Sequence, residues 1–376
     1  MVAGEASGDQ IAAHLIQALQ SRRADIAFGG IGGPKMAAQG FVSAYPMQML
    51  SVRGYSEALR HYREIMRMRR ELGDQLLRER PRLFIGVDSS DFNLGLERRL
   101  KEGGIPAVHY VSPAVWAWRR WRLRRIARSV THMLCMFPFE APIYEKAGVP
   151  ATYVGHPLAD VIPLDPKKDE AKAALRLPLR KLVVALLPGS RRSELEHMAA
   201  TFILTAHRFR QEVTEVHFIV PMVTRETRDM FERTLYEQQQ LDLPLTLMFG
   251  HSHEALAAAD LALVASGTAT LEAALFKTPM VITYKQSALS WFLMRRMLYL
   301  PYVGMPNILA GERLVPELLQ GDAVPHALAA ALLALLRDAA AQKRQVARFH
   351  DIHHLLRQNT AEKAADTLLR ILDRPA

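Results

Sequence analysis

Cysteine and long apolar runs are the two features that this sequence has least of. Its 376 residues include one cysteine, Cys135, so no disulfide can form within the chain. Cys135 lies in an apolar run, where a buried thiol is expected rather than a nucleophile. Even the Ala/Leu-rich run 327–336 falls short of the roughly 20 apolar residues that a membrane-spanning helix needs. Residues 1–9 lack the pattern of a secretory signal, so we expect a cytoplasmic protein that does not cross a membrane.

The sequence also lacks an acidic excess. Its net charge is +10, and residues 1–155 carry 22 Lys and Arg against 14 Asp and Glu, whereas residues 156–376 carry 26 against 24. A positive first half attracts anions, which include nucleic acid, acidic lipid headgroups and phosphorylated substrates. Charge alone does not choose among these classes of partner.

Short apolar runs alternate with amphipathic stretches along most of the chain, a pattern that predicts an α/β protein with parallel sheets. Its length and a Pro-, Asp- and Lys-rich segment predict two lobes: residues 1–160, a linker at 161–180, and residues 181–345. We expect the C-terminal helices at 346–376 to pack back on the first lobe or to be exchanged in a dimer. The predicted strands are 26–29, 83–88, 107–111, 133–137, 152–155, 182–187, 216–221, 245–249, 261–265 and 280–283.

The loop after strand 182–187 has the composition of a phosphate site. Gly189, Ser190 and Arg191 stand between this strand and a helix, where backbone N–H groups and a guanidinium group can bind a diphosphate. The alternative is a tight turn capped by Ser193, with its arginines in solvent.

The loop after strand 261–265 has a similar character. Ser266, Gly267 and Thr268 can approach a phosphate through N–H and hydroxyl groups, and Glu272 can accept hydrogen bonds from a ribose diol. An ordinary helix cap followed by a helical glutamate is the alternative. Both loops together predict a nucleotide-diphosphate pocket in the second lobe.

The first lobe has its own glycine-rich loops. One contains Glu5, Ser7, Gly8 and Asp9, and the other spans residues 29–34. Neither matches the dinucleotide fingerprint, which disfavours a nicotinamide-dependent oxidoreductase. We expect these loops to line the substrate side opposite the nucleotide, although tight turns without a ligand are an equal alternative.

Two carboxylates end the strand 83–88. A sugar hydroxyl that attacks an anomeric carbon must lose its proton, and Asp88 at the strand tip is the candidate general base. Asp91 can cap the following helix, and Asn93 lies two residues further. The spacing of Asp88 and Asp91 is not a D-x-D metal motif, and the histidines form no zinc pattern, so we predict no metal.

Tryptophans and arginines interleave in one segment of the first half. Such a stretch is typical of a surface that meets lipid headgroups, and it also occurs in proteins that bind nucleic acid. No recognised nucleic-acid motif accompanies it, so we expect lipid contact and no nucleic-acid partner. The residues are Trp116, Trp118, Arg119, Arg120 and Trp121.

The order of these motifs resembles one family, the lipid-A-disaccharide synthases, over essentially the whole chain. The matching segments are residues 2–9, 32–36, Asp88 with 91–93, 109–119, 138–140, 155–157, 187–191, 265–272 and 306–311. The resemblance implies a GT-B fold, in which two Rossmann-like lobes face a cleft. It implies an inverting transfer from UDP-2,3-diacylglucosamine to 2,3-diacylglucosamine 1-phosphate (lipid X), giving the β-1,6-linked disaccharide and UDP.

The resemblance also assigns residues and partners. It makes Asp88 the base and Arg191 the diphosphate ligand, with Ser266, Thr268, Glu272 and Asn307 in the donor site and Ser112 on the acceptor side. It implies no cofactor, a homodimer that exchanges C-terminal segments, and peripheral attachment to the cytoplasmic face of the Gram-negative inner membrane. Ser89 and Ser90 replace the family's usual Ala-Pro, which affects the loop that aims Asp88. The alternatives are a UDP-N-acetylglucosamine epimerase or a peptidoglycan glycosyltransferase of the same fold.

Overall fold

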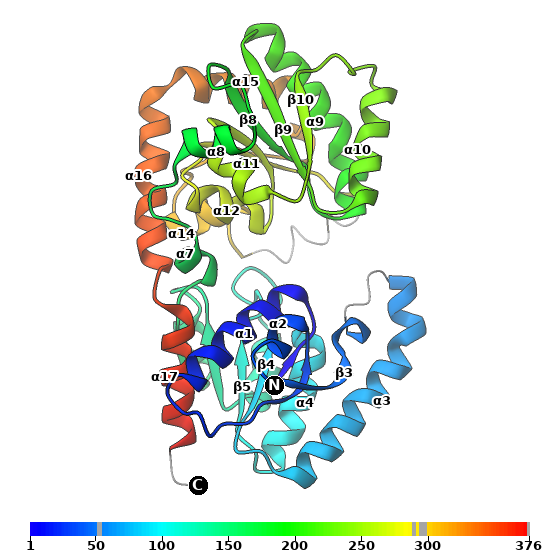
Figure 1. The fold of residues 1–376 in the computed structure, drawn as a ribbon, viewed down its shortest axis with the longest axis vertical. Helices are drawn as coiled ribbons and strands as arrows, with labels where there is room; N and C mark the ends of the chain where they lie inside the picture. The colour runs from blue at the N-terminus through cyan, green and yellow to red at the C-terminus, as the bar shows by residue number, and fades with distance from the viewer. Residues whose placement is uncertain (51–54, 288–290, 293–298, 374–376) are drawn as a thin grey trace. The chain divides into compact units, whose positions relative to one another are not determined.

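The computed structural model describes residues 1–50, 55–287, 291–292 and 299–373. The chain divides into two compact units, one formed by residues 1–160 with 356–376 and the other by residues 161–355 (Figure 1). Each unit is a parallel sheet with helices on both faces, so the predicted α/β class is confirmed. Among the described residues, no helix is both long and apolar enough to cross a bilayer.

The first unit has a seven-stranded sheet in the order β3-β2-β1-β4-β5-β6-β7. Its strands are β1 (Val2–Ala3), β2 (Gly29–Gly32), β3 (Val42–Pro46), β4 (Phe84–Val87), β5 (Ala107–Tyr110), β6 (His132–Cys135) and β7 (Ala151–Tyr153). Its helices are α1 (Ala6–Gln20), α2 (Pro34–Ala37), α3 (Tyr55–Glu79), α4 (Ser90–Glu102), α5 (Arg122–Ser129), α6 (Ala141–Lys146), α7 (Pro157–Val161, which ends in the second unit) and α17 (Thr360–Leu372), with a 3-10 turn at Met47–Met49.

The second unit has a six-stranded sheet in the order β10-β9-β8-β11-β12-β13. Its strands are β8 (Leu182–Leu187), β9 (Val216–Met222), β10 (Leu245–Phe249), β11 (Leu261–Ala265), β12 (Met280–Tyr284) and β13 (Glu317–Leu319). Its helices are α8 (Lys168–Ala174), α9 (Arg192–Glu212), α10 (Arg225–Glu237), α11 (Ser252–Ala258), α12 (Thr268–Leu275), α14 (Met305–Ala310), α15 (Pro325–Arg337) and α16 (Ala339–Leu356), with a 3-10 turn at Gln320–Asp322.

The central strands are apolar along their whole length because helices cover both faces of each sheet. In β8 and β11, every residue except Leu182 is buried. The segment 161–180, which we predicted as a linker, lies in the second unit and contains α8. Lys172 on α8 contacts the Asp260 carboxylate at 2.8 Å, which ties this segment to the start of β11.

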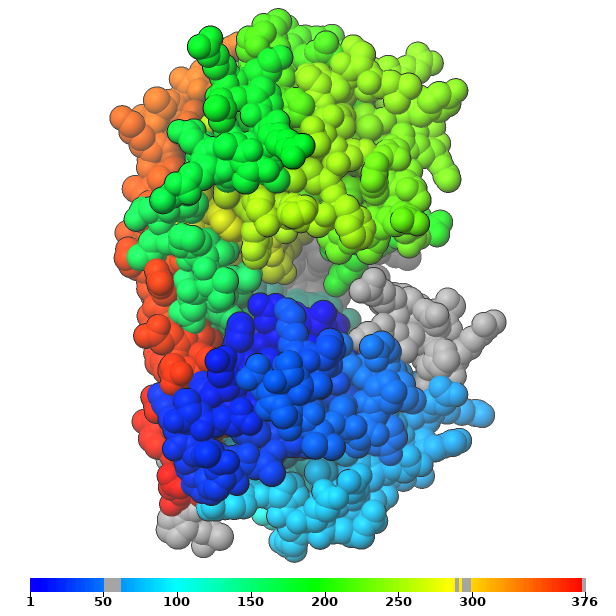
Figure 2. Space-filling model, viewed as in Figure 1, coloured from blue at the N-terminus to red at the C-terminus, as the bar shows by residue number. Residues whose placement is uncertain are grey.

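The C-terminal helix α17 packs in the first unit, beside α1. Ala364, Ala365 and Leu368 join the same apolar core as Leu15 and Ile16. Figure 2 shows the C-terminal and N-terminal residues side by side on one face of this unit. Residues more than 340 positions apart therefore build one core, and ion pairs of Arg22 with Glu362 and Asp366 join the same two parts of the chain at the surface.

Candidate functional site

Both sheets reverse their strand order at one point, which is where open α/β sheets collect ligands at the carboxyl ends of the strands. In the first unit this point lies between β1 and β4, where Ala3 pairs with Val87. The loops that follow, at Gly4 and at Ser89, touch: a Cβ atom placed on Gly4 would lie 2.4 Å from Ser89 Oγ. The structure thus brings the glycine loop and the predicted base into one place.

Asp88 directly follows β4 and has an unusual backbone. Its φ is 53°, and φ of the next residue, Ser89, is 42°, so two non-glycine residues in succession are left-handed. Such conformations cost free energy and cluster at functional sites. The Asp88 N–H group donates to Tyr110 O at 2.8 Å, which continues the β4–β5 ladder and fixes where this turn begins.

Asp91 does not cap α4, which begins after Ser89. Its side chain is 88% exposed, and Arg122 Nη2 donates to its Oδ1 at 2.7 Å. Glu5 and Ser7 are also exposed, whereas Gly8 is buried against Ala3 and the Asp88 side chain. Of the residues predicted on the acceptor side, Asp91, Glu5 and Ser7 remain open to a ligand.

Asp9, which was predicted to line the acceptor side, instead makes hydrogen bonds within the first unit. It is buried, and its carboxylate accepts hydrogen bonds from the N–H groups of Gly33 (2.9 Å), Lys35 (3.0 Å) and Met36 (3.0 Å). These N–H groups belong to the start of α2, and a carboxylate stabilises such a helix end. Asp9 therefore holds the second glycine loop and does not face a substrate. Asn93 is fully buried too, and its Nδ2 donates to Asp88 O at 2.9 Å.

Ser112 lies after β5 in a buried cluster. Its Oγ is 2.8 Å from Tyr144 Oη. Trp116 is buried beside it, with Nε1 donating to Glu140 Oε1 at 3.1 Å and its ring packed edge-on against Phe139. Burial raises the pKa of Glu140 to about 7. Trp116 is therefore a packing residue, and its predicted contact with lipid is wrong because its ring and its N–H group are both enclosed.

The other residues predicted to contact lipid lie nearer the surface. Arg119 stacks on the Trp118 ring, with its Cζ 3.9 Å from the ring centroid. Arg120 is exposed, and Trp121 is 61% exposed. A tryptophan this exposed beside arginines keeps the composition of a headgroup-binding surface.

In the second unit the strand order reverses between β8 and β11, where Val264 pairs with Leu187. Adjacent parallel strands end together, so the two loops predicted to bind the diphosphate are neighbours. Gly189 in the first loop has a φ of 129°, and Gly267 in the second has a φ of 146°, conformations that L side chains rarely adopt.

The first loop is already bound to an internal carboxylate. Glu194 Oε2 on α9 accepts from the N–H groups of Ser190 (2.8 Å) and Arg191 (3.2 Å). The Arg191 side chain is 80% exposed, with its guanidinium 3.9 Å from Glu194. The N–H groups of Ser190 and Arg191 are therefore engaged, whereas the exposed Arg191 guanidinium remains available to an anion.

The second loop has its donors available. Within the described ranges, no recorded hydrogen bond uses the N–H group of Gly267, Thr268 or Ala269. The space beside Gly267 is open for 4 Å. Ser266 Oγ donates to Val303 O at 3.2 Å, which fixes the start of this loop. N–H groups at the N-terminus of α12 form the kind of site that binds phosphate.

Glu272 lies about one turn into α12, half-buried. Burial raises the pKa of its carboxyl group, and His253 on α11, 3.9 Å away, opposes this shift. The His253 ring packs against Phe276. The sequence did not predict His253 as a site residue, because nothing in the spacing of residues 253 and 272 indicates that two helices bring them together.

Asn307 was predicted to line the donor site, but its side chain is fully buried and committed to the backbone. Its Nδ2 donates to Val315 O and to Glu317 Oε1, both at 2.8 Å, and its Oδ1 accepts from Val315 N. Glu317 also accepts from the N–H groups of Val303 and Gly304. Asn307 thus supports the loop that Ser266 contacts, and both hydrogens of its amide group are already donated within the protein.

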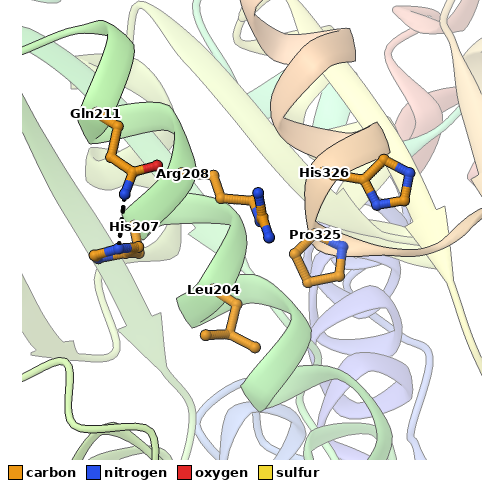
Figure 3. A pocket seen from close by; sticks show the side chains of 6 residues that line it. All are labelled: Leu204, His207, Arg208, Gln211, Pro325 and His326. Atoms are coloured by element: carbon orange, nitrogen blue, oxygen red, sulfur yellow. Dashed lines mark hydrogen bonds between the residues drawn. The ribbon is translucent and has the colours of Figure 1, made fainter.

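The second unit also has a surface hollow of about 230 Å³ on the outer helices α9 and α15 (Figure 3). Leu204, His207, Arg208, Gln211, Pro325 and His326 line it, so it contains none of the predicted site residues. No cluster of three or more His, Cys, Asp or Glu that could hold a metal ion occurs in the part of the chain that the structure describes.

Comparison with solved structures places the fold among GT-B glycosyltransferases and related UDP-sugar enzymes. The UDP-GlcNAc 2-epimerase from Neisseria meningitidis, solved with UDP-GlcNAc, matches with a TM-score of 0.65 at 12% identity over 97% of both chains. The MurG protein of Acinetobacter baumannii matches with a TM-score of 0.56 at 14% identity, again over 97% of both. The predicted GT-B fold is confirmed by these likenesses.

Comparison of sequences is more specific. The family model for lipid-A-disaccharide synthetase matches residues 1–371. A lipid-A-disaccharide synthase of Methylobacillus flagellatus is 54% identical over 99% of this chain and 98% of its own, and one of Azoarcus sp. (strain BH72) is 55% identical over 100% and 96%. The chain therefore belongs to the lipid-A-disaccharide synthetase family and is a glycosyltransferase.

Proposed function

We propose that this protein joins UDP-2,3-diacylglucosamine to 2,3-diacylglucosamine 1-phosphate (lipid X), giving the β-1,6-linked lipid A disaccharide 1-phosphate and UDP with inversion at the anomeric carbon. The observation that carries the proposal is the family match over residues 1–371. The fold supports a UDP-sugar donor, because solved structures with this fold include one with UDP-GlcNAc bound.

The donor's diphosphate is assigned to the second unit, where unengaged donors and a cation occur together. The N–H groups of Gly267 and Thr268 and the guanidinium of Arg191 bind the phosphate oxygens, and Glu272 accepts from the ribose diol. Charge develops on the UDP oxygen as the glycosidic bond breaks, and fixed donors of this kind stabilise it by about 3–4 kcal/mol each. Gly189 and Ser190 shape the first loop, and the proposal requires no metal and no cofactor.

The acceptor is assigned to the first unit. Asp88 takes the proton from the attacking hydroxyl of lipid X, a step worth roughly 100- to 10,000-fold in rate. Glu5, Ser7, Asp91 and Ser112 are the remaining acceptor-side candidates. We also propose peripheral attachment to the cytoplasmic face of the inner membrane through Trp121 and its neighbouring arginines, and a homodimer that exchanges C-terminal segments.

The test is a turnover assay with purified protein, both substrates and detection of the disaccharide by mass spectrometry. Asp88→Ala and Arg191→Ala should each lower kcat/KM by at least 100-fold, and Arg228→Ala, which removes an exposed arginine from α10, should leave it within twofold. Equal turnover of UDP-N-acetylglucosamine and the diacylated donor would overturn the substrate assignment. An epimerised sugar in place of a disaccharide would favour the alternative that the epimerase likeness offers.

A further inference from the structure

Three fully buried polar side chains lie close together near the end of β4, where Asp88 follows. Asn93 and Glu97 project from α4, and His109 belongs to β5. A buried polar group costs free energy unless it is hydrogen-bonded, so a cluster of three between a helix and the sheet requires a reason.

Asn93 binds the turn that contains Asp88. Its Nδ2 donates to Asp88 O at 2.9 Å and lies 3.3 Å from Val2 O and 3.5 Å from Val87 O. One amide group thereby joins the ends of β1 and β4 and holds the first of two left-handed residues. A backbone conformation that sterics disfavour persists only where its surroundings fix it.

Glu97 lies one turn after Asn93 on α4 and pairs with His109. His109 Nδ1 lies 2.6 Å from Glu97 Oε1, and burial raises the pKa of Glu97, with His109 opposing the shift. Gly86 on β4 leaves the room they need: a Cβ atom there would lie 2.1 Å from Glu97 Oε1 and 2.9 Å from Asn93 Cβ. A side chain at position 86 would therefore collide with both Glu97 and Asn93, so Gly86 lets these two residues of α4 lie against β4.

This cluster is not arranged for stability alone. Within the described residues, no protein group is a hydrogen-bond partner of the buried atoms Asn93 Oδ1, Glu97 Oε2 and His109 Nε2. An unsatisfied buried atom costs about 1–3 kcal/mol, and apolar side chains of the same size would avoid this cost. The arrangement is explained if the Nδ2 group of Asn93 is needed where it is.

We propose that Asn93 is a positioning residue for Asp88, which it aims by holding the carbonyl of the left-handed turn, and that the Glu97–His109 pair keeps Asn93 in place. The inference rests on the proposed role of Asp88 as the base. Asn93 contacts no substrate and acts through the backbone of its neighbour, so its loss affects the chemical step and leaves nucleotide binding in the second unit unchanged.

The decisive variant is Asn93→Asp, which preserves the shape of the side chain and replaces the donor with an acceptor that faces three carbonyl groups. Its kcat should fall at least tenfold, while the Kd for UDP stays within twofold of the parent value. Leu96→Ala is the matched control, since Leu96 is equally buried on α4 and packs in an apolar core cluster with Leu72 and Leu100. It should lower Tm comparably and leave kcat within twofold below the unfolding temperature.

A double variant separates positioning from a general structural role. In an Asp88→Asn background, Asn93→Asp should reduce the residual turnover no further, because residues that act as a unit are not additive. A further tenfold loss in that background, or a kcat loss in Leu96→Ala equal to that in Asn93→Asp, makes Asn93 merely structural and overturns the inference. If Asp88→Asn keeps full turnover, Asp88 is not the base and the proposed function of this residue is refuted. If Asp88→Asn is inactive and Asn93→Asp keeps full turnover, only the positioning role of Asn93 is refuted.

Discussion

Replacing Glu140 by glutamine should increase the free energy of unfolding of the first unit relative to the parent protein, and this increase should become larger as the pH rises. Glu140 is 2% exposed, with Oε1 accepting from Trp116 Nε1 and Oε2 from Phe137 N. Desolvation by burial is the largest cause of its raised pKa and outweighs these hydrogen bonds, which act in the opposite direction. The carboxyl group therefore keeps its proton to a higher pH in the folded state than in the unfolded chain.

The magnitude follows from linkage. The pKa rises from 4.5 to about 7, and roughly 2.5 units at about 1.4 kcal/mol each amount to about 3 kcal/mol. Because the folded pKa is raised, this contribution is fully present below pH 4.5 and is lost as the pH increases through 7. Glutamine does not titrate, so the unfolding free energy of Glu140→Gln minus that of the parent should grow by about 3 kcal/mol from pH 4 to pH 8.

The assay is urea unfolding at a series of pH values, followed by tryptophan fluorescence. Three of the four tryptophans lie at positions 116, 118 and 121, so the signal reports mainly on the first unit. Taking the difference between two proteins cancels other titrating groups, including His156, whose pKa burial lowers to about 4. Glu145→Gln, an exposed change on α6, is the control and should give a constant difference. A flat difference for Glu140→Gln as well would refute the desolvation argument.

Three further changes test the roles assigned above. Gly189→Ala should prevent UDP binding in calorimetry, because its φ is 129° and the new Cβ would lie 2.6 Å from Glu194 Cβ; normal affinity would show that the loop can rearrange. Asp9→Ala should destabilise the first unit by about 1–3 kcal/mol in urea, since three N–H groups lose their acceptor, and an unchanged midpoint would contradict that role. Trp121→Ser should lower the fraction of protein that co-sediments with anionic vesicles. Tyr236→Ser, at a residue that is 72% exposed in the second unit, should leave this fraction unchanged. An equal loss in both variants would indicate nonspecific adhesion.

Much of the fold could be predicted from apolar periodicity, and the second unit most closely. The strands at 182–187, 245–249 and 261–265 have the predicted bounds, because each is an apolar run between clear turns. The strand bounds of the first unit were harder to predict. Strand β2 begins at Gly29, where the predicted strand ends, because its sequence is Gly-Gly-Ile-Gly and lacks an apolar run.

Two edge strands were missed for the same physical reason. Residues of β3 (Val42–Pro46) are mostly exposed, and β13 has three residues that are only half-buried. An edge strand needs little apolar surface, since one neighbour and one helix layer suffice to hold it. Hydrophobic patterning therefore carries no signal there, and only the completed sheet defines these strands.

The predicted site residues illustrate what sequence can and cannot resolve. Strand-to-loop junctions located the loops at Asp88, at Arg191 and at Thr268, because a parallel sheet exposes its carboxyl ends to ligands. Sequence could not show which polar side chains in these loops are already occupied. Glu194 is an example: its position three residues after the helix cap is a known capping pattern, yet only the structure shows that it takes the loop's N–H groups.

Whether a side chain's hydrogen-bonding groups are already used within the protein therefore distinguishes residues that can bind the substrates directly from residues that only support the site. A side-chain amide has two donors and one acceptor oxygen, and Asn307 uses both ends on Val315 and Glu317, so it has no geometry left for a nucleotide. Asp9 is committed in the same way to three N–H groups. Arg191 and the N–H group of Thr268 retain their capacity, because one is exposed and the other begins a helix. A ligand binds favourably when it displaces water, and unfavourably when it must break an existing internal hydrogen bond. The exposed polar groups of these loops are therefore the groups that can contact the substrates. The buried polar groups hold the exposed groups in position.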